Sequence, residues 1–263
     1  MYDWPEVRDA TAELESALQG ALVEALGLTP AQIVAWPEEL DLAEAWSRPE
    51  VLLSQTCGYP LTHALDGRVR VVGAPHYAAP GCDGHRYCSH IVVRRDSGAG
   101  DLADLRGARA VYNNPDSQSG MNALRHSVAR VAGGKPFFSS VRPSGGHRAS
   151  LKAVAEGQAD VAAIDAVCWD LACRELPELA VRLRPIARTA SVPVLPLITS
   201  LRVSDAQAEL IAGVAAEVLS APETEKSRER LGIRGFSKLS AEDYAPILSM
   251  EQEALGLGYP ALT

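Results

Sequence analysis

The sequence predicts an α/β fold with mostly parallel sheets and helices on both faces. Two observations carry this prediction. Short apolar segments alternate with helical segments from about residue 102 to residue 174, which is typical of βαβ units. The segment 51–55, Val-Leu-Leu-Ser-Gln, reads as a continuous buried strand, as expected where helices cover both faces of a sheet.

The first part of the chain is predicted to contain two helices and four strands. The first helix carries apolar residues at helical spacing from Val7 to Leu26, and Gly27 follows where a C-terminal cap belongs. The second helix, at 40–46, ends before Pro49. The expected strands lie at 33–36, 51–55, 69–73 and 89–94.

The alternation becomes regular after residue 100. The expected strands are 108–112, 137–141 and 161–164, and the expected helical segments are 102–105, the stretch after Gly120, 148–156 and 166–174. The tail is predicted to be helical at 204–220, 222–231 and 240–254. The sequence contains no internal repeat and no low-complexity segment.

Length, composition and net charge limit the classes of function that the protein can have. With 263 residues the chain is long enough for two modest domains or one large one, and 47% hydrophobic with 22% charged residues is an ordinary globular composition. A net charge of −8 argues against nucleic-acid binding, which needs a basic face. No apolar run is long enough to span a bilayer, and no signal peptide is visible at the N-terminus. The chain as written is therefore expected to be cytoplasmic if Met1 is the true start.

The five cysteines indicate neither a zinc site nor a catalytic thiol. Their spacings differ from the C-x2-C pairs of common zinc sites, so free thiols are expected, with a local Cys82–Cys88 disulfide as the alternative. His85 and His90 flank Cys88 and leave a metal site open as a further alternative. Since no His and Asp pair has the spacing to support Cys57 as a nucleophile, no catalytic residue, metal or cofactor is predicted.

Polar residues gather directly after several predicted strands, where ligands bind in open α/β sheets. The segment NNPDSQSG (113–120) follows one strand and precedes a helix. The first turn of a helix has unpaired N–H groups and a partial positive charge, so it favours an anion. Ser117 and Ser119 add hydroxyl donors, Gln118 an amide, and Gly120 permits close approach of the backbone. The alternative is that these residues only cap the helix.

Each of the other candidate site residues also has a structural explanation that involves no ligand. His147 follows two glycines and is by itself typical of a solvated loop. Asp165, at a strand end, is typical of a helix N-cap. Tyr59 and Tyr87 are by default packing aromatics.

Taken together, three stretches resemble the phosphate/phosphite/phosphonate-binding proteins of ABC importers. They are QTCGYPL (55–61), NNPDSQSGMNALR (113–125) and GGHRASLKAVAEGQADVAAIDAVCWDL (145–171). The resemblance extends over essentially the whole chain. It implies a type II periplasmic-binding-protein fold with two lobes and the ligand in a cleft between them. The implied first lobe comprises residues 1–85 plus 189–263, and the second comprises residues 86–188.

The resemblance also implies roles for individual residues. The family's anion-binding helix entrance, a Ser-x-Ser-Gly pattern, falls on 117–120, and its histidine before the next helix falls on His147. An acidic residue that meets the amino group of aminoalkyl phosphonates matches Asp165. The aromatic contacts fall on Tyr59 and Tyr87.

Two features depart from the family pattern. Gln118 stands where the phosphonate binders carry a smaller hydroxyl residue, so a longer amide is expected to fill space near the anion. Such proteins also begin with a strand before the first helix, whereas this sequence starts at Met-Tyr-Asp, which suggests a start further upstream. Tyr2 would then lie in the loop that faces the cleft.

The resemblance implies a monomeric, non-enzymatic solute-binding protein that captures a small oxyanion and works with an ABC permease, in the periplasm. One alternative is a cytoplasmic sensor or effector-binding module. Another is an enzyme on the same fold, such as the pyrimidine-precursor synthases of thiamin metabolism. Those synthases need a cysteine-rich iron segment, and this sequence contains no contiguous cysteine cluster.

Overall fold

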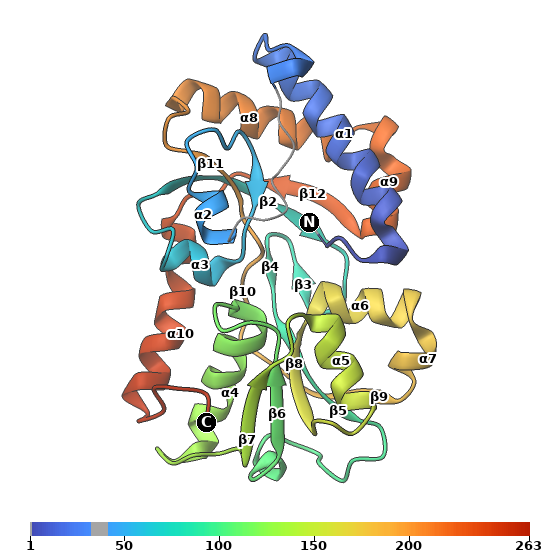
Figure 1. The fold of residues 1–263 in the computed structure, drawn as a ribbon, viewed down its shortest axis with the longest axis vertical. Helices are drawn as coiled ribbons and strands as arrows, with labels where there is room; N and C mark the ends of the chain where they lie inside the picture. Colours follow the sequence, from blue (N-terminus) through green and yellow to red (C-terminus); the bar gives the residue numbers. More distant parts are fainter. Residues whose placement is uncertain (1, 33–41) are drawn as a thin grey trace. The chain divides into compact units, whose positions relative to one another are not determined.

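The computed structural model describes residues 2–32 and 42–263, and within them the chain forms two compact units (Figure 1). The first unit comprises Met1–Ala78, Asp83–His85 and Pro193–Tyr244; the second comprises Ala79–Cys82, Arg86–Val192 and Ala245–Thr263. The strand predicted at 33–36 lies outside the described residues, as does the start of the helix predicted at 40–46.

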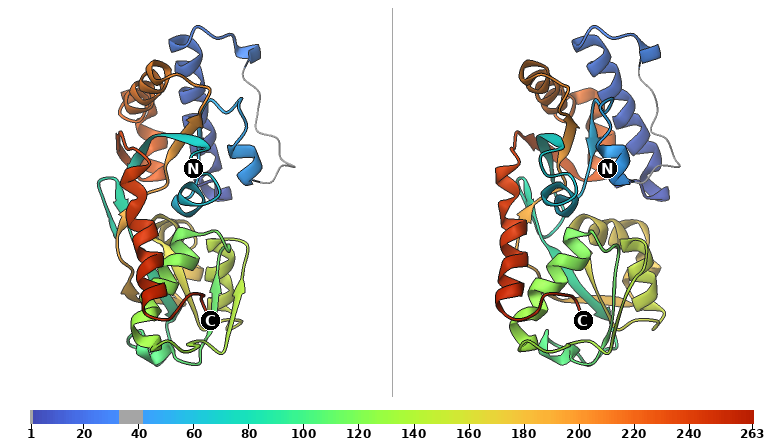
Figure 2. Two further views of the ribbon diagram at one scale, coloured as in Figure 1. Left: turned by 90° about the vertical axis from the view of Figure 1, so that its left-hand side faces the viewer. Right: turned by 60° about the vertical axis from the view of Figure 1, so that its left-hand side comes forward.

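The first unit is built on a four-stranded sheet with helices packed against it (Figure 2). The strand order is β1 (Ser54–Gln55), β11 (Leu197–Ser200), β2 (Val69–Tyr77), β12 (Ile233–Ser237). The longer helices are α1 (Arg8–Ala25), α8 (Asp205–Val218) and α9 (Glu225–Leu231). The short helical segments are η1 (Pro5–Val7), η2 (Pro30–Gln32), α2 (Leu42–Trp46), α3 (Gly58–Thr62), η5 (Pro222–Thr224) and η6 (Glu242–Tyr244).

The strands of this sheet run antiparallel, which corrects the prediction of mostly parallel sheets. The central strand β2 pairs antiparallel with both β11 and β12. A run of apolar residues reports that a strand is buried on both faces and says nothing about the direction of its neighbours. The segment 51–55 is likewise shorter than predicted, since only Ser54–Gln55 pairs with another strand.

The second unit is a five-stranded mixed sheet with helices on both faces. The strand order is β7 (Ser140–Pro143), β6 (Arg109–Tyr112), β8 (Val161–Asp165), β5 (Ser89–Arg94), β9 (Leu183–Arg188). Strand β6 runs parallel to β7 and β8, whereas β5 runs antiparallel to β8 and β9. The helical segments are η3 (Ala103–Leu105), η4 (Gln118–Asn122), α4 (Ala123–Ala132), α5 (His147–Ala155), α6 (Ala166–Glu175), α7 (Pro177–Ala180) and α10 (Ala245–Gly256). The two-residue strands β3 (Cys82–Asp83), β4 (Arg86–Tyr87) and β10 (Val192–Pro193) lie near residues where the chain passes from one unit to the other.

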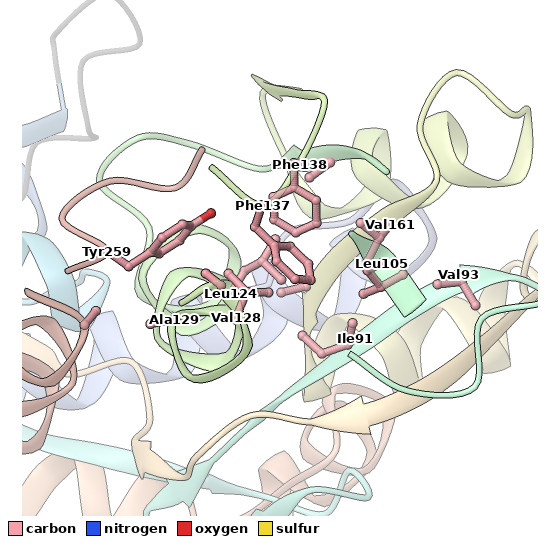
Figure 3. Packing of buried hydrophobic residues seen from close by; sticks show 14 residues of the cluster. Ile91, Val93, Leu105, Leu124, Val128, Ala129, Phe137, Phe138, Val161 and Tyr259 are labelled. Carbon is pink, nitrogen blue, oxygen red and sulfur yellow. The ribbon is translucent and has the colours of Figure 1, made fainter. Parts of the chain in front are cut away.

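Helix α4 is anchored in a hydrophobic core of the second unit (Figure 3). Leu124 and Val128 of α4 belong to one cluster with Ile91 and Val93, alternate residues of β5 that share one face of the sheet. The rings of Phe137 and its neighbour Phe138 meet edge to face in the same cluster, with centroids 5.1 Å apart. This packing fixes the direction in which α4, and therefore η4 at its start, leaves the sheet.

The C-terminal helix α10 belongs to the second unit, whereas the predicted lobe boundaries placed residues 245–263 in the first. Ala254 and Tyr259 join the same hydrophobic cluster as α4, and Arg125 of α4 donates a hydrogen bond to the carbonyl of Pro260 (3.0 Å). Figure 2 shows α10 lying alongside α4. A helical period identifies such a segment as amphipathic and cannot identify the helix that will cover its apolar face.

Candidate functional site

Three helix entrances of the second unit lie at one edge of its sheet. The parallel strands β6, β7 and β8 end at this edge, and each is followed by a helical segment: η4, α5 and α6 respectively. The alternation of strands and helices in the sequence predicted this arrangement. It brings the neighbourhoods of Ser119, His147 and Asp165 to the same side of the sheet.

Ser117 caps the first entrance. Its backbone is extended (φ −87°, ψ 129°), and its Oγ accepts a hydrogen bond from the N–H of Gly120 (3.0 Å). The capping role that the sequence left open is therefore present at Ser117. A hydroxyl that accepts one bond still has a proton to donate, so capping is compatible with contact to a bound anion.

Ser119 connects the first two entrances. Its Oγ lies 2.8 Å from Nε2 of His147, the first residue of α5, and 3.4 Å from Oγ of Ser117. The side chains that the sequence placed 28 residues apart are thus in direct hydrogen-bond contact. Two hydroxyls and an imidazole meet where two helices begin.

His147 is neutral at pH 7. Burial lowers its pKa from 6.5 to about 4, although the residue as a whole keeps some solvent exposure. Its Nδ1 is buried and has no hydrogen-bond partner among the described residues. A neutral imidazole carries one N–H donor and one acceptor nitrogen, so this side chain retains hydrogen-bonding capacity beyond its contact with Ser119.

Asp165 acts as the N-cap of α6. Its Oδ1 accepts hydrogen bonds from the N–H groups of Val167 (2.7 Å) and Cys168 (3.3 Å), and the residue is 1% exposed. A carboxylate at a helix N-terminus offsets the partial positive charge there. The entrance of α6 thus already holds an anionic group, whereas η4 and α5 begin with uncharged side chains.

Glycine is required at position 120 because the side chain of Asn113 packs closely against its backbone, a contact that the sequence did not reveal. A Cβ at this position would lie 1.9 Å from Oδ1 of Asn113, an atom that is buried and without a hydrogen-bond partner among the described residues. The carbonyl of Asn113 also accepts from the N–H of Gly145 (2.9 Å), which ties the loop before η4 to the loop before α5. The only sequence signal for Asn113 was its place directly after a strand.

The side chain of Gln118 is directed toward other partners than the two serines. It is fully buried, its Nε2 donates to Sδ of Met250 on α10 (3.4 Å), and its Oε1 accepts from Nδ2 of Asn122 (2.7 Å). The expectation that this amide fills space near an anion therefore has no support from these contacts. The side chain of Gln118 thus makes contacts to α10 and within η4.

Of the three predicted aromatic contacts, one belongs to the second unit and two belong to the first. Tyr87 is 1% exposed, as a packing aromatic would be. Tyr59 and Tyr2 belong to the first unit, where Tyr59 stacks on His63 (centroids 3.9 Å apart) and Tyr2 meets Tyr77 edge to face (5.3 Å). The second unit by itself therefore gathers the two serines, His147 and Asp165.

The cysteines are free thiols, and the alternative of a Cys82–Cys88 disulfide is not seen. Burial, with a smaller effect of Asp165, raises the pKa of Cys82 to about 12, so this thiol is protonated at neutral pH. Within residues 2–32 and 42–263, no group of three or more His, Cys, Asp or Glu side chains is placed to hold a metal ion. In the same residues, none of the helices combines the length and apolar content that crossing a bilayer requires.

The chain resembles known proteins in sequence and in fold. The family of periplasmic substrate-binding proteins of phosphonate ABC transporters matches residues 11–244. No curated protein matches the sequence.

Three solved structures illustrate the likeness in fold. A binding-protein component of a phosphonate ABC transporter from Pseudomonas aeruginosa is 19% identical with a TM-score of 0.75, covering 95% of this chain and 83% of that one. PhnD1 from Prochlorococcus marinus, in complex with methylphosphonate, is 13% identical with a TM-score of 0.72 (94% and 93% covered). A Xanthomonas citri protein bound to ATP is 18% identical with a TM-score of 0.70 (92% and 91% covered). The predicted α/β fold of the two-lobed periplasmic binding proteins is confirmed.

Proposed function

Because the chain belongs to the family of periplasmic phosphonate substrate-binding proteins of ABC transporters, we propose that its second unit binds a small tetrahedral oxyanion where η4 and α5 begin. Proteins of this family bind small ligands and work with a membrane permease. The observation that carries the proposal is the 2.8 Å contact between Ser119 Oγ and His147 Nε2, which joins two helix entrances. Both entrances offer N–H groups that have no partner inside their own helices.

In this proposal the anion is held by neutral donors. Its oxygens accept hydrogen bonds from the Ser117 hydroxyl, from backbone N–H groups of the first turn of η4, and from one donor of the Ser119–His147 pair. That donor is the Ser119 hydroxyl when Nε2 of the neutral imidazole donates to Ser119, and the Nδ1–H of His147 when Ser119 donates to Nε2. Asp165 keeps its capping role, so that no second anion competes at the entrance of α6. A methylphosphonate or phosphate ion fits this donor set, because each of its oxygens accepts several hydrogen bonds without needing a cation beside it.

The proposal includes the rest of the family role. The protein delivers its ligand unchanged to a permease, acts as a monomer, and works in the periplasm, where the family normally resides. Tyr59, Tyr87 and Tyr2 remain proposed contacts.

Isothermal titration of protein freed of bound ligand by unfolding and refolding tests the proposal. Methylphosphonate, phosphite, phosphate, sulfate and acetate are titrated at pH 7.5. At least one tetrahedral oxyanion is expected to bind with a Kd of about 10 μM or tighter, a free energy of roughly 7 kcal/mol. At 100 times its Kd it stabilises the folded protein by about 2.7 kcal/mol, which a thermal-shift measurement detects.

The control distinguishes anion binding from catalysis and from general salt effects. ³¹P NMR after overnight incubation is expected to show methylphosphonate unchanged, and acetate is expected to give no heat of binding. If every oxyanion binds more weakly than about 1 mM, the proposed function is wrong.

Titration of His147 makes the free energy of unfolding depend on pH, and a bound anion is expected to weaken this dependence. Its pKa in the folded protein is about 4, below the 6.5 of an unfolded chain, so the folded state resists protonation. Stability that is full above pH 6.5 is therefore lost as the pH falls toward 4, by on the order of 2 kcal/mol for a partly exposed group. A phosphate ion beside the ring favours the protonated form and raises the pKa, so saturating phosphate reduces this loss.

Urea unfolding of the wild type and of His147→Gln at pH 7 and pH 4.5 measures the effect. The variant is expected to lose about 2 kcal/mol less stability than the wild type over this interval. Equal losses in the two proteins would show that His147 does not titrate as its burial requires.

A further inference from the structure

A chain of buried polar side chains runs from η4 through α4 to α10. Asn122 donates from Nδ2 to Oε1 of Gln118 (2.7 Å), and its Oδ1 accepts from Nη2 of Arg125 (2.7 Å). The same Nη2 donates to Oε1 of Glu251 on α10 (2.9 Å). These four residues are called the Gln118–Glu251 network below.

The network is enclosed by the second unit. Gln118 and Asn122 are completely buried, Arg125 is 4% exposed, and the side chain of Glu251 is 18% exposed. Buried polar and charged groups cost folding energy unless they are paired, and apolar residues of similar volume often serve stability equally well. Stability alone therefore does not explain why polar residues occupy these buried positions.

The network closes on an unusual turn of helix. The N–H of Asn122 donates to the carbonyl of Ser117 five residues earlier (3.0 Å), which makes η4 a π-helical turn. Such turns are rare and occur frequently at functional sites. The side-chain bond from Asn122 to Gln118 joins the last residue of this turn to its first. Nδ2 of Asn122 also donates to the carbonyl of Ile247 (3.3 Å), so the turn is fastened to α10 as well as to itself.

Ser119 lies inside the turn that the network fastens. Its hydroxyl points to His147, whereas the flanking Gln118 side chain is held by Asn122 and Met250. The position of the Ser119 hydroxyl relative to the imidazole is thus set by side chains that do not contact the proposed anion.

We propose that the Gln118–Glu251 network is a positioning device, which holds the π-helical turn so that the hydrogen-bonded pair of Ser119 and His147 presents its remaining donor to an oxyanion. The proposal rests on the proposed function and deepens it. It also assigns a role to Gln118, the residue that differs from the phosphonate-binding pattern. The amide of this side chain holds the π-helical turn through its hydrogen bonds to Asn122 and Met250. Asn122, Arg125 and Glu251 are positioning residues in the same sense.

Gln118→Met tests the proposal, because methionine preserves length and removes the acceptor of Asn122 and the donor to Met250. In the free protein, the NMR titration of the His147 imidazole is expected to move at least one pH unit upward from about 4, as the loosened turn admits water to the ring. Methylphosphonate is expected to bind about tenfold more weakly. The matched control is Ser127→Ala, which removes a hydrogen bond of the following helix α4 (Oγ to the carbonyl of Ala123, 2.7 Å) outside the network. Both measurements are expected to stay at wild-type values in the control.

The two measurements separate this proposal from the proposed function. An unchanged His147 titration in Gln118→Met, or methylphosphonate affinity within twofold of a binding wild type, overturns the positioning role. If the wild type binds none of the oxyanions, the proposed function fails, while the titration still decides the role of the network. Should Gln118→Met not fold, Met250→Leu removes only the sulfur acceptor of the Gln118 amide. It is expected to move the titration the same way with about threefold weaker binding, and an unmoved titration again refutes the proposal.

Discussion

Replacing both Ser117 and Ser119 by alanine is expected to weaken methylphosphonate binding at least 100-fold. A hydrogen bond to a charged group is worth about 1.5–3 kcal/mol, so the loss of two hydroxyl donors costs roughly 3 kcal/mol or more. The Ser119 substitution also removes the partner of His147 Nε2, which leaves the imidazole less well oriented. Isothermal titration at pH 7.5 measures the change.

The double variant should remain folded, which separates lost binding from lost structure. Ser117 caps η4 through its bond to the Gly120 N–H, and removal of such a cap costs about 1 kcal/mol of folding free energy. Ser117→Thr keeps both the hydroxyl and the cap and serves as the conservative control, with near wild-type affinity expected. Methylphosphonate affinity that survives the double substitution would remove the anion from residues 117–120.

Gly120→Ala is expected to destabilise the protein by about 2 kcal/mol, a typical cost of overpacking. The new Cβ would lie 1.9 Å from Oδ1 and 2.9 Å from Cγ of Asn113, so the asparagine side chain must move. In an unhindered helix the same substitution would instead stabilise by about 1 kcal/mol, because glycine is the poorer helix former. The sign of the effect in urea unfolding therefore reports the contact directly.

Asn113→Ala provides the matched background. Oδ1 of Asn113 has no hydrogen-bond partner in the described part of the chain, so this substitution alone is expected to cost about 1 kcal/mol or less. In that background the penalty of Gly120→Ala is expected to fall below about 1 kcal/mol. Oδ1 and Cγ of Asn113 are then gone, and the next nearest atom, the backbone N of Asn113, lies 3.1 Å from the Cβ. Equal penalties in the two backgrounds would contradict the assignment of the contact.

The position of the candidate site followed from the sequence, because strand ends of a parallel sheet meet at one edge. That rule predicted that the segment 117–120, His147 and Asp165 would be neighbours, and the parallel pairing of β6 with β7 and β8 brings their strand ends together. The 2.8 Å contact between Ser119 and His147 lay beyond prediction, since it depends on side-chain rotamers. The direction of the Gln118 side chain could not be predicted either, because its partner Met250 lies 132 residues further along the chain.

For the fold, too, the elements that local sequence determines were predicted, and those that depend on distant partners were not. Strand β5 lies at the predicted residues 89–94, and α5 begins one residue before its predicted start. Strands β9, β11 and β12 were not predicted, because their short mixed sequences carry no clear alternation and are stabilised by pairing with distant strands. The strand predicted at 137–141 begins only at Ser140, since Phe137 and Phe138 turn into the hydrophobic cluster.

The discontinuity of the second unit determines how the candidate site can be isolated. The serines and His147 lie in one stretch of sequence. Met250, Glu251 and Tyr259, which contact or pack with η4 and α4, come after the entire intervening segment 193–244. A fragment cut as one continuous piece of 86–192 would leave Arg125 without its counter-ion and would remove Ala254 and Tyr259 from the hydrophobic cluster around α4. A fragment that keeps the candidate site must therefore join 86–192 to 245–263 by a new linker, which is an internal deletion of the first unit's segment and not a truncation at one end.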